Sequence, residues 1–149
     1  MAIALQAGVA SAETAVLECI SSLFTVGKSG GKTFVQFRMT AAPDWKISKA
    51  ALLLHSTGET LPVNVEVGLA ETKWNEFDPS VTPVAGKTRK YEVTALKEGW
   101  IRIELDPAQA QLIKHGLAVI VPAAKTKPFH LRDSMQYSPY LLLEGTRKD

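Results

Sequence analysis

Hydrophobic and polar residues alternate along four stretches of this chain, as they do in a β-strand that buries one of its two faces. In residues 33–40, Val35 and Phe37 share one face of an extended strand, whereas Gln36 and Arg38 share the other. The residues that we expect to face the core in the four strands are Val35, Phe37, Met39, Ala50, Leu52, Leu54, Val63, Val65, Val67, Leu69, Ile101, Ile103 and Leu105.

Five shorter segments are also expected to form strands, because turn-forming glycine, proline and polar residues separate them. About nine short strands in one chain indicate an all-β fold, and we expect a jelly-roll β-sandwich of antiparallel strands. Residues 1–145 would form this single domain, and residues 146–149 would be a flexible tail. The additional strands are predicted at 15–20, 88–94, 117–121, 128–132 and 140–144.

One segment departs from the alternation and predicts a short helix that crosses from one sheet to the other. Asp106 has a side chain suited to the N-cap, and Pro107 follows at the first helical position. His115 would lie in the last turn, where a basic side chain is favoured, and Gly116 would end the helix.

The length and composition are those of one folded domain. The chain has 149 residues, of which 46% are hydrophobic and 21% charged, enough for a single core. Its net charge of +2 is too small to indicate a nucleic acid as partner. Apolar runs are far shorter than the ~20 residues that cross a bilayer, so we expect no membrane insertion. Residues 1–14 lack the basic start of a signal peptide and are expected to be mature sequence.

Several motifs occur along the chain in a characteristic order. They include LQAGV at residues 5–9, FVQFRM at 34–39, ISKAALLLH at 47–55 and FHLRDSMQYSPYLLLE at 129–144. Together they resemble the DNRLRE-type β-sandwich domain over nearly the whole chain. The resemblance implies a jelly-roll fold, an extracellular or cell-surface location, and a relation to the carbohydrate-binding modules attached to polysaccharide lyases.

Signatures of a metal or cofactor site are weak in this sequence. His55, His115 and His130 lie in separate predicted elements, which does not give the spacing of a metal-ligand motif. We expect no cofactor, although a structural calcium held by scattered oxygen atoms stays open. Cys19, the single cysteine, falls in an apolar strand and is expected to be a buried, inert thiol.

Signatures of catalysis are equally weak. Glu66 and Glu104 lie on outward strand faces, as a glycosidase pair would, but Arg102 beside Glu104 is more typical of a solvated ion pair. The motif VGKSGGKT at 26–33 is one residue short of a phosphate-binding loop and leads into a strand, so it predicts a hairpin turn. We therefore expect that the protein is not an enzyme.

The outward face around Trp100 is the candidate binding surface. An aromatic ring can stack on the C–H face of a sugar, while neighbouring polar side chains bond to its hydroxyl groups. Arg38 and Arg102 would suit the carboxylates of an acidic polysaccharide. The expected ligand-binding residues are Trp100, Arg102, Glu104, Arg38, Gln36 and His55.

Other aromatic and polar residues have two interpretations each. Trp74 matches a core position and is expected to be structural. Trp45 either offers a second stacking platform or plugs one end of the sandwich. The polar residues His130, Arg132 and Asp133 either bind a ligand or fix the last strand.

These observations favour a non-catalytic polysaccharide-binding module of an extracellular protein. The alternative is a structural spacer or assembly domain of a surface or fibre protein. In that case Phe34 and Leu53, which are apolar residues on outward faces, would pack against a partner. Oligomerisation therefore stays open.

Overall fold

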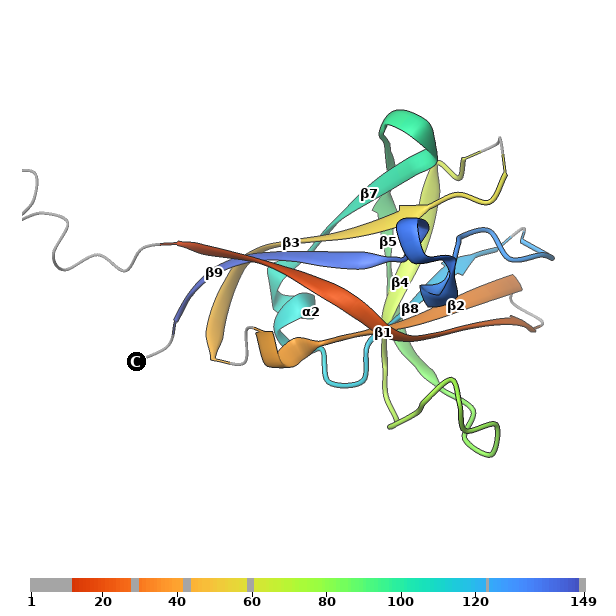
Figure 1. The fold of residues 1–149 in the computed structure, drawn as a ribbon, viewed down its shortest axis with the longest axis horizontal. Helices are drawn as coiled ribbons and strands as arrows, with labels where there is room; N and C mark the ends of the chain where they lie inside the picture. Colours follow the sequence, from red (N-terminus) through yellow and green to blue (C-terminus); the bar gives the residue numbers. More distant parts are fainter. Residues whose placement is uncertain (1–11, 28–29, 42–43, 59–60, 123, 148–149) are drawn as a thin grey trace, which may run out of the picture.

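The computed structural model describes residues 12–27, 30–41, 44–58, 61–122 and 124–147 (Figure 1). Its strands are β1 (Glu13–Gly27), β2 (Gly30–Phe37), β3 (Trp45–His55), β4 (Asn64–Ala70), β5 (Ala85–Glu92), β6 (Thr94–Ala95), β7 (Trp100–Leu105), β8 (Leu117–Val121) and β9 (Tyr140–Arg147). These nine strands form one curled antiparallel sheet in the order β5-β4-β8-β2-β1-β9-β3-β7-β6, which confirms the all-β class.

β1 is long enough to belong to both halves of the sheet. Residues 13–18 pair with β9, whereas residues 19–27 pair with β2, with a shift in register between Cys19 and Ser21. In Figure 1, β1 runs from its place beside β9 on the left to its place beside β2 on the right. We call β9, β3, β7 and β6 with the first part of β1 the β3 half, and β2, β8, β4 and β5 with the second part the β4 half.

The predicted inward residues form a core that the two halves share. Leu52 and Leu54 of β3, Phe37 of β2 and Val67 of β4 are each at most 2% exposed. At about 1.5–3 kcal/mol for each fully buried side chain, this core is the main source of stability. Val63 is an exception, because it precedes β4 and is 74% exposed.

The outward faces are less open to solvent than the alternation predicted. Phe34 and Leu53 are 2% and 1% exposed, so the expectation that they could pack on a partner is wrong. Phe34 packs edge-on against Trp74 with ring centroids 6.0 Å apart, and the Trp74 indole N–H donates to the His115 carbonyl. Trp74 is therefore structural, as expected. Trp45 is buried in the shared core and offers no platform.

The connection before β9 differs from the prediction. Residues 128–132 form no strand, because Phe129 makes only a single bridge to Ser56 and the chain then turns into the 3-10 helix η3 (Arg132–Tyr137). β9 continues through Arg147, two residues into the expected tail. The LQAGV motif, residues 148–149 and residues 28–29 at the predicted hairpin turn lie outside the described residues.

The predicted helix forms as α2 (Pro107–Gln111) and connects β7 in the β3 half with β8 in the β4 half. Asp106 caps it by accepting a hydrogen bond from the Ala108 N–H at 2.8 Å. The helix is shorter than predicted, because it ends at Gln111 and not beside His115. Among the described residues, no helix has the length and apolar character needed to cross a membrane.

Candidate functional site

Trp100 stands at the start of β7, half-buried on the outer face of the β3 half. His55 lies opposite it on β3, and the ring centroids of the two residues are 5.2 Å apart. Tyr140 of β9 is 5.5 Å from Trp100, and Tyr137 of η3 stacks on His55 at 3.9 Å. With His130, 5.1 Å from Tyr137, these rings form what we call the aromatic cluster.

Two histidines fix the centre of this cluster. Nε2 of His55 is 2.7 Å from the Glu98 carbonyl oxygen, which can only accept, so Nε2 carries the proton. Nδ1 of His55 is then an acceptor, and Nδ1–H of His130 donates to it over 3.0 Å. The two histidines are 75 residues apart in the sequence and meet on the outer face. His55 is only 8% exposed, so it contacts the Trp100 ring edge-on from the neighbouring strand and, contrary to expectation, does not itself face a ligand.

The turn before β7 packs closely against the His55 ring. Glu98 has φ 60° and ψ 32°, and Gly99 has φ 87°, both in the left-handed region of backbone conformation. A Cβ atom on Gly99 would lie 3.0 Å from the His55 Nε2 atom. Glycine is therefore required here both for its backbone angle and for space. In the sequence, only the Gly99–Trp100 pair indicates this turn. The need for glycine follows from the position of His55, which is the register partner of Trp100.

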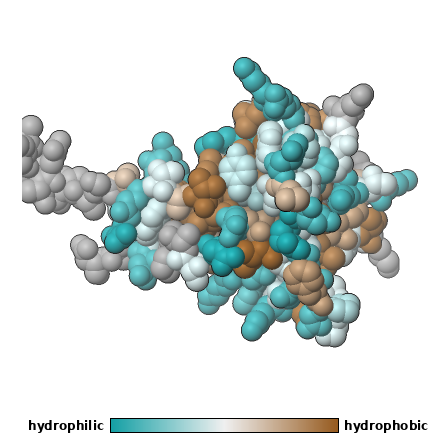
Figure 2. Space-filling model, viewed as in Figure 1, coloured by the Kyte–Doolittle hydropathy of each residue, from teal (hydrophilic) through white to brown (hydrophobic). Residues whose placement is uncertain are grey.

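A groove crosses the outer face beside the aromatic cluster. The strand order puts Val16 and Glu18 of β1 at one end, Tyr140 in the middle and Trp100 at the other end. Met135 of η3, which is 87% exposed, contributes to the wall together with Arg132 and Gln136. Figure 2 shows hydrophobic side chains among hydrophilic ones over the middle of β1 and β9. We call this feature the Trp100 groove.

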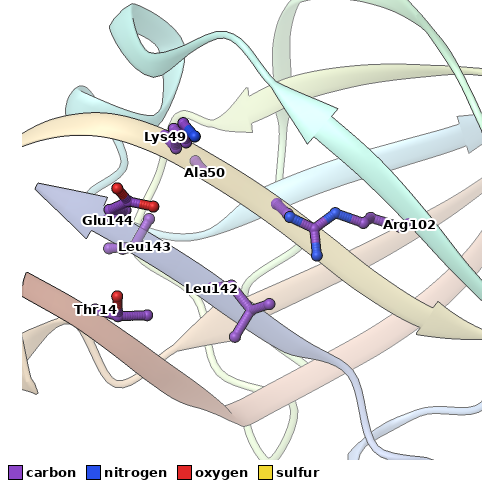
Figure 3. Close-up of a pocket in the computed structure, with 8 residues that line it drawn as sticks. Thr14, Lys49, Ala50, Arg102, Leu142, Leu143 and Glu144 are labelled. Atoms are coloured by element: carbon purple, nitrogen blue, oxygen red, sulfur yellow. The ribbon is translucent and has the colours of Figure 1, made fainter.

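A shallow hollow on the same outer face adjoins the Trp100 groove. Its lining includes Thr14, Lys49, Arg102, Leu142 and Glu144. Leu142 is the register partner of Val16, so the hollow and the groove share a border on β1 and β9. Figure 3 shows Arg102 reaching from β7 over β3. The outer face therefore offers one continuous surface that extends across several strands.

The predicted site residues fall into three groups. Arg102 and Glu104 lie on the same outer face as Trp100 and form an ion pair with each other. Arg38 reaches the edge of the groove, where its Nε lies 2.6 Å from an oxygen of Glu18. Gln36 lies apart from them, in a separate hollow formed with Trp74 and the connection after β4.

An ion pair that the sequence did not reveal holds the wall of the groove. Nε and Nη2 of Arg132 donate to the two carboxylate oxygens of Glu76, at 2.6 and 3.1 Å. The Ser22 N–H also donates to Glu76, and the Arg132 N–H donates to Ser22 Oγ. The Arg132 guanidinium lowers the pKa of Glu76, and Glu76 raises the pKa of Arg132. Arg132 therefore fixes η3 to β1.

Two further side chains with reactive groups are those of Glu66 and of Cys19, which contributes to the lining of the Trp100 groove. Glu66 accepts a hydrogen bond from the Thr88 hydroxyl at 2.8 Å. Cys19 is buried, as the sequence predicted. Burial raises the pKa of its thiol to about 11, so the thiol is protonated at neutral pH. Within the described residues, no group of three or more His, Cys, Asp or Glu side chains could hold a metal ion.

Comparisons with protein-family models and with curated proteins find no match for this chain. Its function therefore has to be inferred from the geometry of the Trp100 groove and from the chemistry of the residues that line it.

Proposed function

We propose that this protein is a non-catalytic polysaccharide-binding module and that a sugar chain lies in the Trp100 groove. The observation that carries the proposal is the pairing of Trp100 with Tyr140, whose ring centroids are 5.5 Å apart at an open groove. Aromatic rings suit the apolar C–H face of a sugar ring. Glu18, Gln136 and Ser138, which also line the groove, supply acceptors and donors for hydroxyl groups.

The contacts around His55, which packs against Trp100, favour a binding surface that is preorganised. His55 is held by the Glu98 carbonyl, by His130 and by stacking on Tyr137. Because His55 is fixed and contacts Trp100, the Trp100 ring has little conformational freedom. A ligand would therefore immobilise few side chains when it binds. Each side chain that does not have to be immobilised saves about 0.5–1.5 kcal/mol of binding free energy.

We also propose that the curled sheet is a jelly roll of the DNRLRE type, in a secreted or cell-surface protein. Two features support this fold assignment. The two halves of the sheet enclose one core, and β1 passes from one half to the other. The motif segments at 47–55 and 129–144 provide much of the outer face that carries the Trp100 groove. The step from this fold to sugar binding is an analogy, and the groove supplies its physical basis.

Affinity electrophoresis against a panel of polysaccharides tests the proposal. We expect binding to at least one of them, and Trp100→Ala or Tyr140→Ala should weaken it about tenfold, equivalent to about 1.4 kcal/mol. Leu112→Ala is the matched control, because Leu112 is 63% exposed but lies after α2 and outside the groove. Circular dichroism and thermal unfolding would establish that each variant is folded.

Two results would overturn the proposal. One is the absence of binding to every polysaccharide in the panel. The other is an oligomer in sedimentation experiments that Trp100→Ala dissociates, since the Trp100 groove would then be an assembly interface.

A further inference from the structure

We infer that the sugar chain bound in the Trp100 groove is an uncharged polysaccharide and not a polyuronate. The inference rests on the proposed function and concerns the class of ligand. Its basis is that the three guanidinium groups beside the groove, those of Arg38, Arg102 and Arg132, each have a carboxylate of this chain as a partner.

Arg132 is the guanidinium that lines the groove, and its ion pair is the most buried of the three. The Arg132 and Glu76 side chains are 33% and 17% exposed. To bind a sugar carboxylate, Arg132 would have to leave Glu76, and a partly buried carboxylate without its partner is costly. The same move would break two of the contacts that hold η3, which forms the wall of the groove.

Arg38 and Arg102 are more exposed, but each has a carboxylate beside it. Glu18, the partner of Arg38, lines the groove itself and would repel an approaching uronate. Glu104 lies next to Arg102 on β7 and is 61% exposed. The charges of these ion pairs largely cancel one another, so this part of the outer face attracts a polyanion only weakly.

The neighbouring hollow also carries charges of both signs. Lys49 of β3 lies opposite Glu144 of β9 in the strand register, and both residues line the hollow. A sugar chain that extended from the Trp100 groove over this surface would again meet alternating charges. Carboxylates accept hydrogen bonds from sugar hydroxyls, whereas they repel sugar carboxylates. The lining of both depressions therefore favours hydroxyl-rich, uncharged chains.

Binding measurements at two ionic strengths test the inference. Neutral β-glucan, xylan and mannan would be compared with polygalacturonate and alginate, at about 20 mM and about 500 mM NaCl. We expect a neutral polysaccharide to bind most tightly, with an affinity that changes less than about twofold between the two salt concentrations. Tighter binding of a polyuronate that salt abolishes would overturn the inference and leave the proposed function standing. Failure of every polysaccharide to bind would overturn both.

A charge variant tests the same reasoning from the opposite direction. Glu104→Gln leaves the Arg102 guanidinium without its carboxylate on an exposed strand. We expect this variant to gain at least about threefold in affinity for polygalacturonate at low salt, and to lose the gain at about 500 mM NaCl. The double variant Arg102→Gln with Glu104→Gln is the matched control and should show no gain. If Glu104→Gln binds polygalacturonate no better than the original protein does, the paired carboxylate is not what excludes polyuronates and the inference is wrong.

Discussion

Acidification should destabilise this protein by protonating His130, which lies beside His55. The Nδ1 atoms of the two rings are 3.0 Å apart, and protonation of His130 places a positive charge in this partly buried cluster. Burial, followed by the neighbouring His55, lowers the pKa of His130 below its ordinary value. Lys127 also lowers this pKa, whereas Asp133 raises it.

The sign and size of the effect follow from proton linkage. An unfolded chain protonates His130 near its ordinary pKa of about 6.5, whereas the folded protein does so only at lower pH. The contribution to stability is therefore complete above pH ~6.5 and is lost as the pH falls towards the folded pKa. One proton limits the loss to about 1.4 kcal/mol per pH unit in this interval, or about 2–4 °C in Tm for each kcal/mol.

Urea unfolding between pH ~5 and ~8 measures this loss. His130→Asn should have a shallower pH dependence, because the asparagine amide can still donate to His55 but does not titrate. His115→Asn is the matched control, since His115 lies outside the aromatic cluster, and it should keep the full slope. Equal slopes for the original protein and His130→Asn would refute the reasoning. So would an NMR titration of the His130 ring with a midpoint above ~6.5.

Two further substitutions test contacts that hold the fold. Gly116 has φ +90°, and a Cβ atom there would lie 2.1 Å from the Val35 carbonyl oxygen. Gly116→Ala should therefore lower the free energy of unfolding by at least about 1–3 kcal/mol, and an unchanged urea midpoint would contradict this. Glu76→Gln should cost about 1–3 kcal/mol by weakening the double contact with Arg132. It should also speed proteolysis of residues 71–84, and a cleavage rate equal to that of the original protein would show that the ion pair does not anchor this connection.

The inner face of the sheet was predictable because it depends on local spacing alone. Alternate side chains of a strand point to the same side, so Leu52 and Leu54 had to share a face. The prediction of a strand at 128–132 was wrong because the structure of this segment depends on contacts that are distant in sequence. Phe129 is anchored by a single bridge, and Arg132 is drawn to a carboxylate 56 residues earlier in the chain.

The candidate site was predictable only in part. Trp100 and Arg102 were expected on one face because they are two residues apart on one strand. Their neighbours His55 and Tyr140 come from strands distant in sequence, so their approach depends on strand order and register. The pairing of Glu76 with Arg132 likewise joins two connections whose positions no local pattern specifies.

The same ion pair joins two segments that cover parts of the outer face. The connection after β4 covers the outer side of β2 through Trp74 and Phe34, and η3 covers His55 on the β3 half. These two segments meet at β1, where the Ser22 N–H donates to Glu76 and the Arg132 N–H donates to Ser22 Oγ. Because β1 belongs to both halves, this point connects the packing on the β4 half with the wall of the Trp100 groove. The Trp100 groove therefore lies beside both of these coverings, and its shape depends on residues on both sides of β1.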